Sequence, residues 1–129
     1  MYCFKSHLEG DIIEIERRVV KALTVEGFGI LSTIDIQATL KDKLGTDGLP
    51  YKILGVCNLP IAHQAIETEP DIGLLLPCNL VIREVKDGSV IVSFMDPVAV
   101  LKLVDQPLMG DLAMDVRQRL ERVRDAIER

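Results

Sequence analysis

The sequence predicts a single domain that mixes helices and strands, and three observations support this prediction. The chain has 129 residues, a length that fits one domain. Its hydrophobic content is 48%, which is enough for one buried and mainly aliphatic core. Segments with helical periodicity alternate with β-rich segments, and no linker or low-complexity stretch divides the chain.

The chain is predicted to begin with a strand and an amphipathic helix. Cys3–Leu8 has the composition of a short strand. Asp11 and Glu14 have the spacing of a capping box, and apolar residues then recur at helical intervals to about Glu26. Gly27 is expected to end this first helix.

A second strand, a short helix and a third strand follow. Phe28–Ile34 is predicted as the second strand. Asp35 has the properties of a helix N-cap, and the short helix it starts carries apolar residues every four positions until Gly45. Thr46–Pro50 is a loop, and Tyr51–Cys57 is predicted as the third strand.

The middle of the chain is predicted to form a helix and then a hairpin. Pro60 favours a helix start, because its missing N–H costs nothing in a first turn, and this helix must end before Pro70. Leu74–Val85 is predicted as a fourth strand. Asp87-Gly88 is a dipeptide preferred where both central residues of a tight turn need positive φ, so Val90–Met95 is expected to return antiparallel.

Two helices are predicted to close the chain. Asp96-Pro97 is expected to cap a short helix that reaches about Val104. A final helix over about residues 111–128 places an apolar stripe opposite its arginines and acids. The stripe consists of Leu112, Val116, Leu120, Val123 and Ile127.

Two sheet arrangements fit this order of elements. A parallel wound sheet is the default for strands that alternate with helices. The closing hairpin and the long terminal helix suit an α+β layer, in which a curved sheet packs against helices on one face. The pattern of apolar residues leaves both arrangements open.

Four segments closely resemble the domain of unknown function 302 family: Gly27–Leu31, Ile34–Thr39, Tyr51–Asn58 and Glu69–Asn79. The resemblance covers a core of roughly residues 23–107. It implies a small, mostly prokaryotic kind of protein with no established activity. It also implies an α+β fold of the TATA-binding-protein-like class, with a curved, mainly antiparallel sheet of about five strands and helices packed on one face. DNA binding is not carried over, because a shared fold does not confer a function.

Charge and hydropathy exclude several classes of partner. Fifteen Lys and Arg against twenty Asp and Glu give a net charge of -5, which is the wrong sign for neutralising phosphates. Aromatic residues make up 4%, too few for a base-stacking platform, so we expect no nucleic-acid binding. The most apolar window, Ile72–Ile82, is about half as long as a membrane span. Three cysteines and an amino terminus without a signal peptide lead us to expect a cytoplasmic protein.

The tripeptide Cys-Asn-Leu occurs twice, beginning at Cys57 and at Cys78. If the third and fourth strands are antiparallel neighbours, both cysteines, Asn58 and Asn79 lie at one end of the sheet, and His63 is expected to face the same region. A thiol near a helix N-terminus has a lowered pKa, which suits redox chemistry or capture of a soft metal. A closed zinc site needs four ligands, however, and only three are visible here, so no metal is assigned. The other interpretation is that the thiols pack in the core and the asparagines cap helices or fill turns.

Two functions from different classes therefore remain. The first is a non-catalytic binding or interaction module, in which the sheet and the terminal helix hold a small apolar ligand. The alternative is a thiol-based redox or soft-metal-binding protein that uses Cys57 and Cys78. We favour the first, because no nucleophile is paired with a general base and no cofactor motif is present. The apolar composition also leads us to expect a two-fold homodimer.

Overall fold

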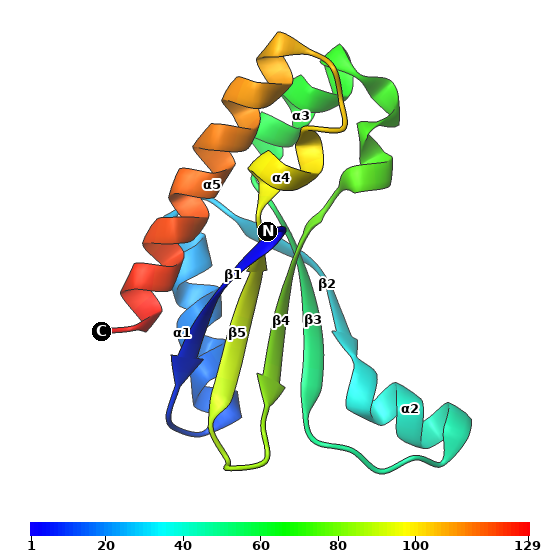
Figure 1. Cartoon of the computed structure of the whole chain (residues 1–129), viewed down its shortest axis with the longest axis vertical. Coiled ribbons are helices and arrows are strands. Elements are labelled where there is room, and N and C mark those ends of the chain that lie inside the picture. Colours follow the sequence, from blue (N-terminus) through cyan, green and yellow to red (C-terminus); the bar gives the residue numbers. More distant parts are fainter.

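A five-stranded antiparallel sheet forms one layer of the fold (Figure 1). The structure is a computed structural model that describes residues 1–129. The strands follow the order β1-β5-β4-β3-β2, and every neighbouring pair is antiparallel. Their bounds are β1 (Cys3–Leu8), β2 (Gly29–Asp35), β3 (Tyr51–Cys57), β4 (Cys78–Glu84) and β5 (Val90–Met95). The α+β prediction is confirmed, and the parallel wound sheet is excluded.

Helices cover only one face of this sheet. The helices of the whole chain are α1 (Ile12–Val25), α2 (Ile36–Leu44), α3 (Leu59–Thr68), α4 (Pro97–Leu101) and α5 (Pro107–Ile127), with a 3-10 helix η1 (Pro70–Leu75). α1 and α5 lie against one face, while α3, η1 and α4 gather beyond the end of the sheet, beside the first half of α5 (Figure 1). No helix lies on the opposite face, and none is both long enough and apolar enough to cross a membrane.

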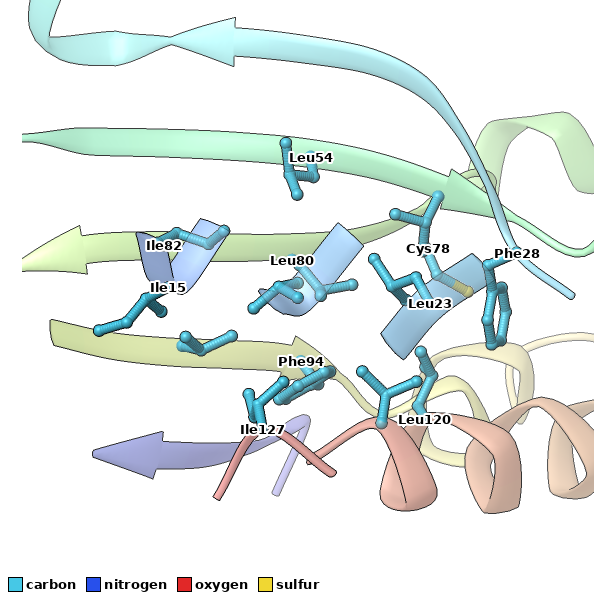
Figure 2. Close-up of a cluster of buried hydrophobic side chains, with 14 of the residues drawn as sticks. Ile15, Leu23, Phe28, Leu54, Cys78, Leu80, Ile82, Phe94, Leu120 and Ile127 are labelled. Atoms are coloured by element: carbon cyan, nitrogen blue, oxygen red, sulfur yellow. The ribbon is translucent and has the colours of Figure 1, made fainter. Parts of the chain in front are cut away.

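The main hydrophobic core lies between the sheet and the two long helices (Figure 2). Alternate residues of the central strands point into it, because side chains in a strand alternate between the two faces. The largest of its fully buried side chains are Ile15, Leu23, Leu54, Leu80, Ile82, Phe94, Leu120 and Ile127. Burying each of these side chains stabilises the fold by about 1.5–3 kcal/mol relative to leaving it exposed.

A second, smaller cluster holds the helices at the end of the sheet. Its six buried residues come from α3, η1, α4 and α5: Ala65, Ile72, Leu101, Met109, Leu112 and Ala113. The apolar stripe of α5 continues from this cluster into the main core, so one helix contributes to both. α5 begins at Pro107, earlier than the predicted start near residue 111, because proline is well suited to a first helical turn.

Four predicted helix caps are present in the structure. Asp11, Asp35, Asn58 and Asp96 each accept a hydrogen bond through a side-chain oxygen from a backbone N–H of the first turn. These bonds satisfy backbone donors that have no partner inside the helix. The starts of α1, α2, α3 and α4 are therefore determined locally, by single residues.

The predicted fourth strand begins later than Leu74. The segment Pro70–Leu75 is a 3-10 helix instead, and its residue Ile72 is buried in the second cluster. Pro77 lacks the N–H that a sheet interior needs, so regular pairing starts only at Cys78. Burial of Ile72 in the second cluster thus outweighs the strand propensity of Leu74, Leu75 and Leu76.

The hairpin predicted at Asp87-Gly88 is present, but its turn differs from the prediction. Only Gly88 has positive φ, at 87°. The N–H of Gly88 donates to the carbonyl of Val85, and the N–H of Val85 donates to the carbonyl of Ser89. These bonds describe a three-residue loop in which glycine takes the left-handed position, rather than a two-residue loop.

Gly55 permits a close approach at the end of the sheet. A Cβ at this position would lie 2.8 Å from Cγ of Pro77 and would also collide with the hydroxyl of Ser32. The neighbouring strand β2 has a register irregularity between Ile30 and Ser32, which places Ser32 opposite Gly55. A side chain here would push apart β2 and the chain that leads into β4.

Candidate functional site

The two Cys-Asn pairs lie at the same end of the sheet. Strands β3 and β4 are antiparallel, with Val56 opposite Cys78 and Gly55 opposite Asn79. Cys57 therefore follows the residue that pairs with Cys78. This arrangement confirms the antiparallel pairing on which the sequence-based hypothesis depends.

A small apolar cavity lies at this end, between the main core and the second cluster. Cys57, Asn58 and Cys78 line it together with aliphatic side chains from α3, α4 and α5. Its volume is about 30 Å³. Ordinary ligand pockets measure roughly 300–1,000 Å³, so the cavity admits a ligand larger than a few atoms only if the second cluster moves away from the core.

The structure does not bring the other two candidate residues to this cavity. Asn79 is exposed and lies on the opposite face of the sheet from Cys78, because neighbouring residues of a strand point to opposite faces. His63 lies on the outside of α3, where its Nε2 is 3.1 Å from a carboxylate oxygen of Glu67. Asn58 caps α3 by accepting from the N–H of Ile61.

Burial governs the chemistry of the two thiols. Cys57 is 7% exposed and Cys78 is 5% exposed. Burial raises the pKa of both thiols, and for Cys78 burial together with the nearby Cys57 raises the pKa to about 12. Nearly all of each group is therefore the neutral thiol at pH 7, which opposes thiolate chemistry. No three His, Cys, Asp or Glu side chains gather where they could hold a metal ion.

The uncovered face of the sheet, called the open face below, is a second candidate site. It consists of the outward residues Cys3, Lys5, His7, Ser32, Ile34, Tyr51, Ile53, Gly55, Asn79, Val81, Arg83, Ile91, Ser93 and Met95. The three central strands contribute aliphatic side chains to it, including Ile53, Val81 and Ile91. This face is not among the sites predicted from the sequence, although apolar residues at successive positions of β4 and β5 were a signal for it.

The open face has a distinctive charge. None of the twenty acidic residues of the chain lies on it. It carries Lys5 and Arg83, and neither side chain takes part in an ion pair. Both cations line a hollow of about 390 Å³ together with Tyr51, Val81 and Met95.

A chain of hydrogen bonds at the edge of the open face resembles catalytic machinery only in its residue types. Nε2 of His7 lies 2.6 Å from Oγ of Ser89, and that hydroxyl donates to Oδ1 of Asp87 over 2.6 Å. Hydrogen bonds from Ser89 lower the pKa of Asp87, so the carboxylate is ionised and holds the hydroxyl proton. His7 must then donate to Ser89, and it does not act as a base that would activate this hydroxyl.

Comparisons with known proteins identify relatives that are described as uncharacterized. Residues 4–127 match the family described as "Domain of unknown function DUF302". An uncharacterized protein of Aquifex aeolicus (strain VF5) is 29% identical over 94 residues, which cover 72% of this chain and 59% of that protein. The chain thus spans about three-fifths of the length of this curated relative. The crystal structure of the uncharacterized conserved protein DUF302 from Bacillus stearothermophilus is similar over 98% of both chains, with 27% identity and a TM-score of 0.89.

Proposed function

The chain belongs to the DUF302 family, which has no assigned activity, and we therefore propose a function from its own surfaces: a non-catalytic binding module that docks a partner on the open face. A single observation carries this proposal. The open face combines aliphatic side chains on its central strands with two unpaired cations and no carboxylate.

The composition of this face differs from that of an ordinary solvated sheet. An antiparallel sheet with one face in water normally places polar residues on that face. Here Ile53, Val81 and Ile91 point outward from the three central strands. A partner that covers them would gain about 25 cal/mol for each Å² of apolar surface removed from water. The face favours a protein partner over a nucleic acid, because two cations and the single aromatic ring of Tyr51 are too few to neutralise phosphates and stack successive bases.

The groups near this face support binding rather than catalysis. The hydroxyl of Ser89 is engaged by Asp87, and His7 donates to it. The buried thiols of Cys57 and Cys78 have raised pKa values, so the thiol-based alternative gains no support. Ser89 directs its proton to the ionised Asp87 rather than to His7, and no hydrogen bond joins either buried thiol to a general base, which covalent catalysis requires.

Photo-crosslinking in the native host tests the proposal. A benzophenone-bearing amino acid replaces Val81 on the open face, and the matched control carries it in place of the exposed Lys21 on α1. We expect one discrete crosslinked product from Val81 and none from Lys21. The product should disappear when Arg83→Glu is added to the Val81 variant. Equal crosslinking from both positions, or none from Val81, would contradict the proposal.

A second candidate function is binding of a small apolar molecule in the interior cavity. The observation that favours it is the apolar lining, in which Asn58 supplies the one amide. Xenon is a suitable probe, because dry apolar cavities bind it. Xenon should shift the methyl NMR signals around the cavity in the wild type but not in Ala65→Leu, which fills it, while Ala126→Leu on the exposed side of α5 serves as the control. If xenon leaves the wild-type signals unchanged, this candidate is eliminated.

A further inference from the structure

We propose that the partner docked on the open face is a second copy of this chain, which presents its α3–η1 segment, Leu59–Leu75. This inference rests on the proposed function, because it names the occupant of the same face. Three observations carry it: the charge of the segment, its exposed aliphatic side chains, and its position in the molecule.

The charge of the α3–η1 segment is complementary to that of the open face. The segment carries the carboxylates of Glu67, Glu69 and Asp71, and it contains no Lys or Arg. Only Glu67 has a nearby basic side chain, with Nε2 of His63 3.1 Å from its carboxylate, and the other two carboxylates have no ion-pair partner. The open face has the opposite composition, with two unpaired cations and no carboxylate. Opposite charges on two surfaces direct which surfaces meet and in what register.

The segment also presents apolar side chains that need a partner. Leu74 is 87% exposed, more than any other leucine, isoleucine or valine of the chain, and Leu59 and Ile66 are 60% and 46% exposed. The open face offers aliphatic side chains of matching character at its centre, among them Ile53 and Val81. Contact between the two surfaces would remove both sets from water.

The position of the segment requires that the contact be made between two molecules. α3 and η1 lie beyond the end of the sheet, so a chain cannot place them on its own open face (Figure 1). A two-fold axis would repeat this contact twice within a dimer, whereas a head-to-tail arrangement would produce rings or filaments. A two-fold dimer of open face against open face is disfavoured, because it would enclose Lys5 and Arg83 of both copies with no carboxylate beside them.

Charge reversal on each surface tests this contact by sedimentation velocity in low salt. The face variant carries Lys5→Glu and Arg83→Glu, and the segment variant carries Glu67→Lys and Asp71→Lys. We expect the wild type to associate and each variant to weaken that association by about tenfold or more. A mixture of the two variants should associate again, because each reversed surface then meets its reversed counterpart. Added salt should weaken association of the wild type, since exposed charges are screened.

Two further variants separate the effect of net charge from that of the apolar contact. Lys21→Glu with Lys86→Glu changes the net charge as much as the face variant does, at exposed positions outside both surfaces, and should associate like the wild type. Leu74→Ser removes apolar surface without reversing a charge and should also weaken association by about tenfold. Thermal melts establish that every variant is folded.

The outcomes separate this inference from the proposed function. A wild type that sediments as a 14.3 kDa monomer at the highest concentration reached would overturn the second-copy inference. Association that is lost in the face variant but unchanged in the segment variant and in Leu74→Ser would also overturn it, in favour of a dimer of open face against open face. A Val81 crosslink to a different protein keeps the proposed function and rejects the second copy. A Val81 crosslink to the α3–η1 segment of a second copy supports both.

Discussion

Alkaline pH should destabilise the protein through the thiol of Cys78. This side chain is 5% exposed, and burial together with the neighbouring thiol of Cys57 raises its pKa from 9.0 to about 12. In the unfolded chain the thiol returns to its ordinary pKa. A group whose pKa is raised by folding contributes stability below its unfolded pKa and loses that contribution as pH rises toward the folded pKa. The window for Cys78 therefore runs from pH 9.0 to about pH 12.

The size of the effect follows from these two values. Within the window, each pH unit removes about 1.4 kcal/mol of unfolding free energy, because the unfolded chain releases a proton that the folded chain retains. The loss is about 2 kcal/mol near pH 10.5 and about 4 kcal/mol once pH 12 is reached. A small domain has a total stability of about 5–15 kcal/mol, so this one thiol affects a large share of it.

Urea unfolding over a series of pH values measures the effect. The comparison is between the wild type and Cys78→Ala, in which the cavity left by the sulfur lowers stability by a similar amount at every pH. The difference in unfolding free energy between the two proteins should therefore shrink by about 2 kcal/mol between pH 8 and pH 10.5. Cys3→Ala, at a partly exposed edge position, is the matched control and should give a curve parallel to that of the wild type.

Two results would refute this reasoning. One is a pair of parallel curves for the wild type and Cys78→Ala across the alkaline range, because the thiol would then ionise equally in both states. The other is rapid labelling of Cys78 by a thiol reagent in the native protein. A buried thiol should react only when the structure opens.

Three further predictions concern single positions. Gly55→Ala should lower the unfolding free energy by about 1–3 kcal/mol, because the added methyl group has no room. Gly110→Ala lies in an exposed turn of α5, where an added Cβ would meet no atom within 4 Å, and it should raise the unfolding free energy by about 0.5–1 kcal/mol. A Gly110→Ala protein that is less stable than the wild type would contradict this pair of predictions. Asp87→Asn should make the unfolding free energy less dependent on pH at acid pH. Hydrogen bonds from Ser89 lower the pKa of Asp87, so the carboxylate contributes stability above pH 3.8 and loses that contribution as pH falls below this value. Urea unfolding that shows the same acid pH dependence for Asp87→Asn and the wild type would contradict this prediction. Asn58→Ala removes the cap of α3 and should cost about 1 kcal/mol by thermal melting, whereas Asn79→Ala on the open face should cost almost nothing; equal losses would mean that the cap is unimportant.

Elements that depend on neighbouring residues could be predicted from the sequence. β1 and β3 have the predicted bounds, and Asp11, Asp35 and Asp96 start helices as predicted, because strand composition and caps act over a few residues. The hairpin at Asp87-Gly88 is predictable for the same reason. The choice between a parallel and an antiparallel sheet was not, since it depends on which distant strands pair.

Features that depend on distant packing could not be predicted. The leucine-rich segment before β4 has the composition of a strand, but Ile72 anchors it as a 3-10 helix in a cluster built with α4 and α5. The side chains of Cys57, Asn58 and Cys78 meet at one cavity because β3 pairs with β4, whereas His63 points outward because of its position on α3. The open face became recognisable only when the pairing of all five strands had assigned each side chain to one face.

The pairing of β1 with β5 has a consequence for the order in which the molecule folds. Cys3 lies opposite Met95 and Leu8 lies opposite Val90, so the first strand of this sheet in chain order pairs with its last. Until β5 has been synthesised, β1 has no neighbouring strand in the sheet. The apolar side chains of α1 and of the earlier strands then remain partly exposed to water. Folds closed by such distant contacts form more slowly than folds built from local contacts, because the entropy of loop closure must be overcome before the contacts form. The nascent chain therefore passes through a stage with exposed strand edges, during which protection from aggregation matters more than it does for the finished protein.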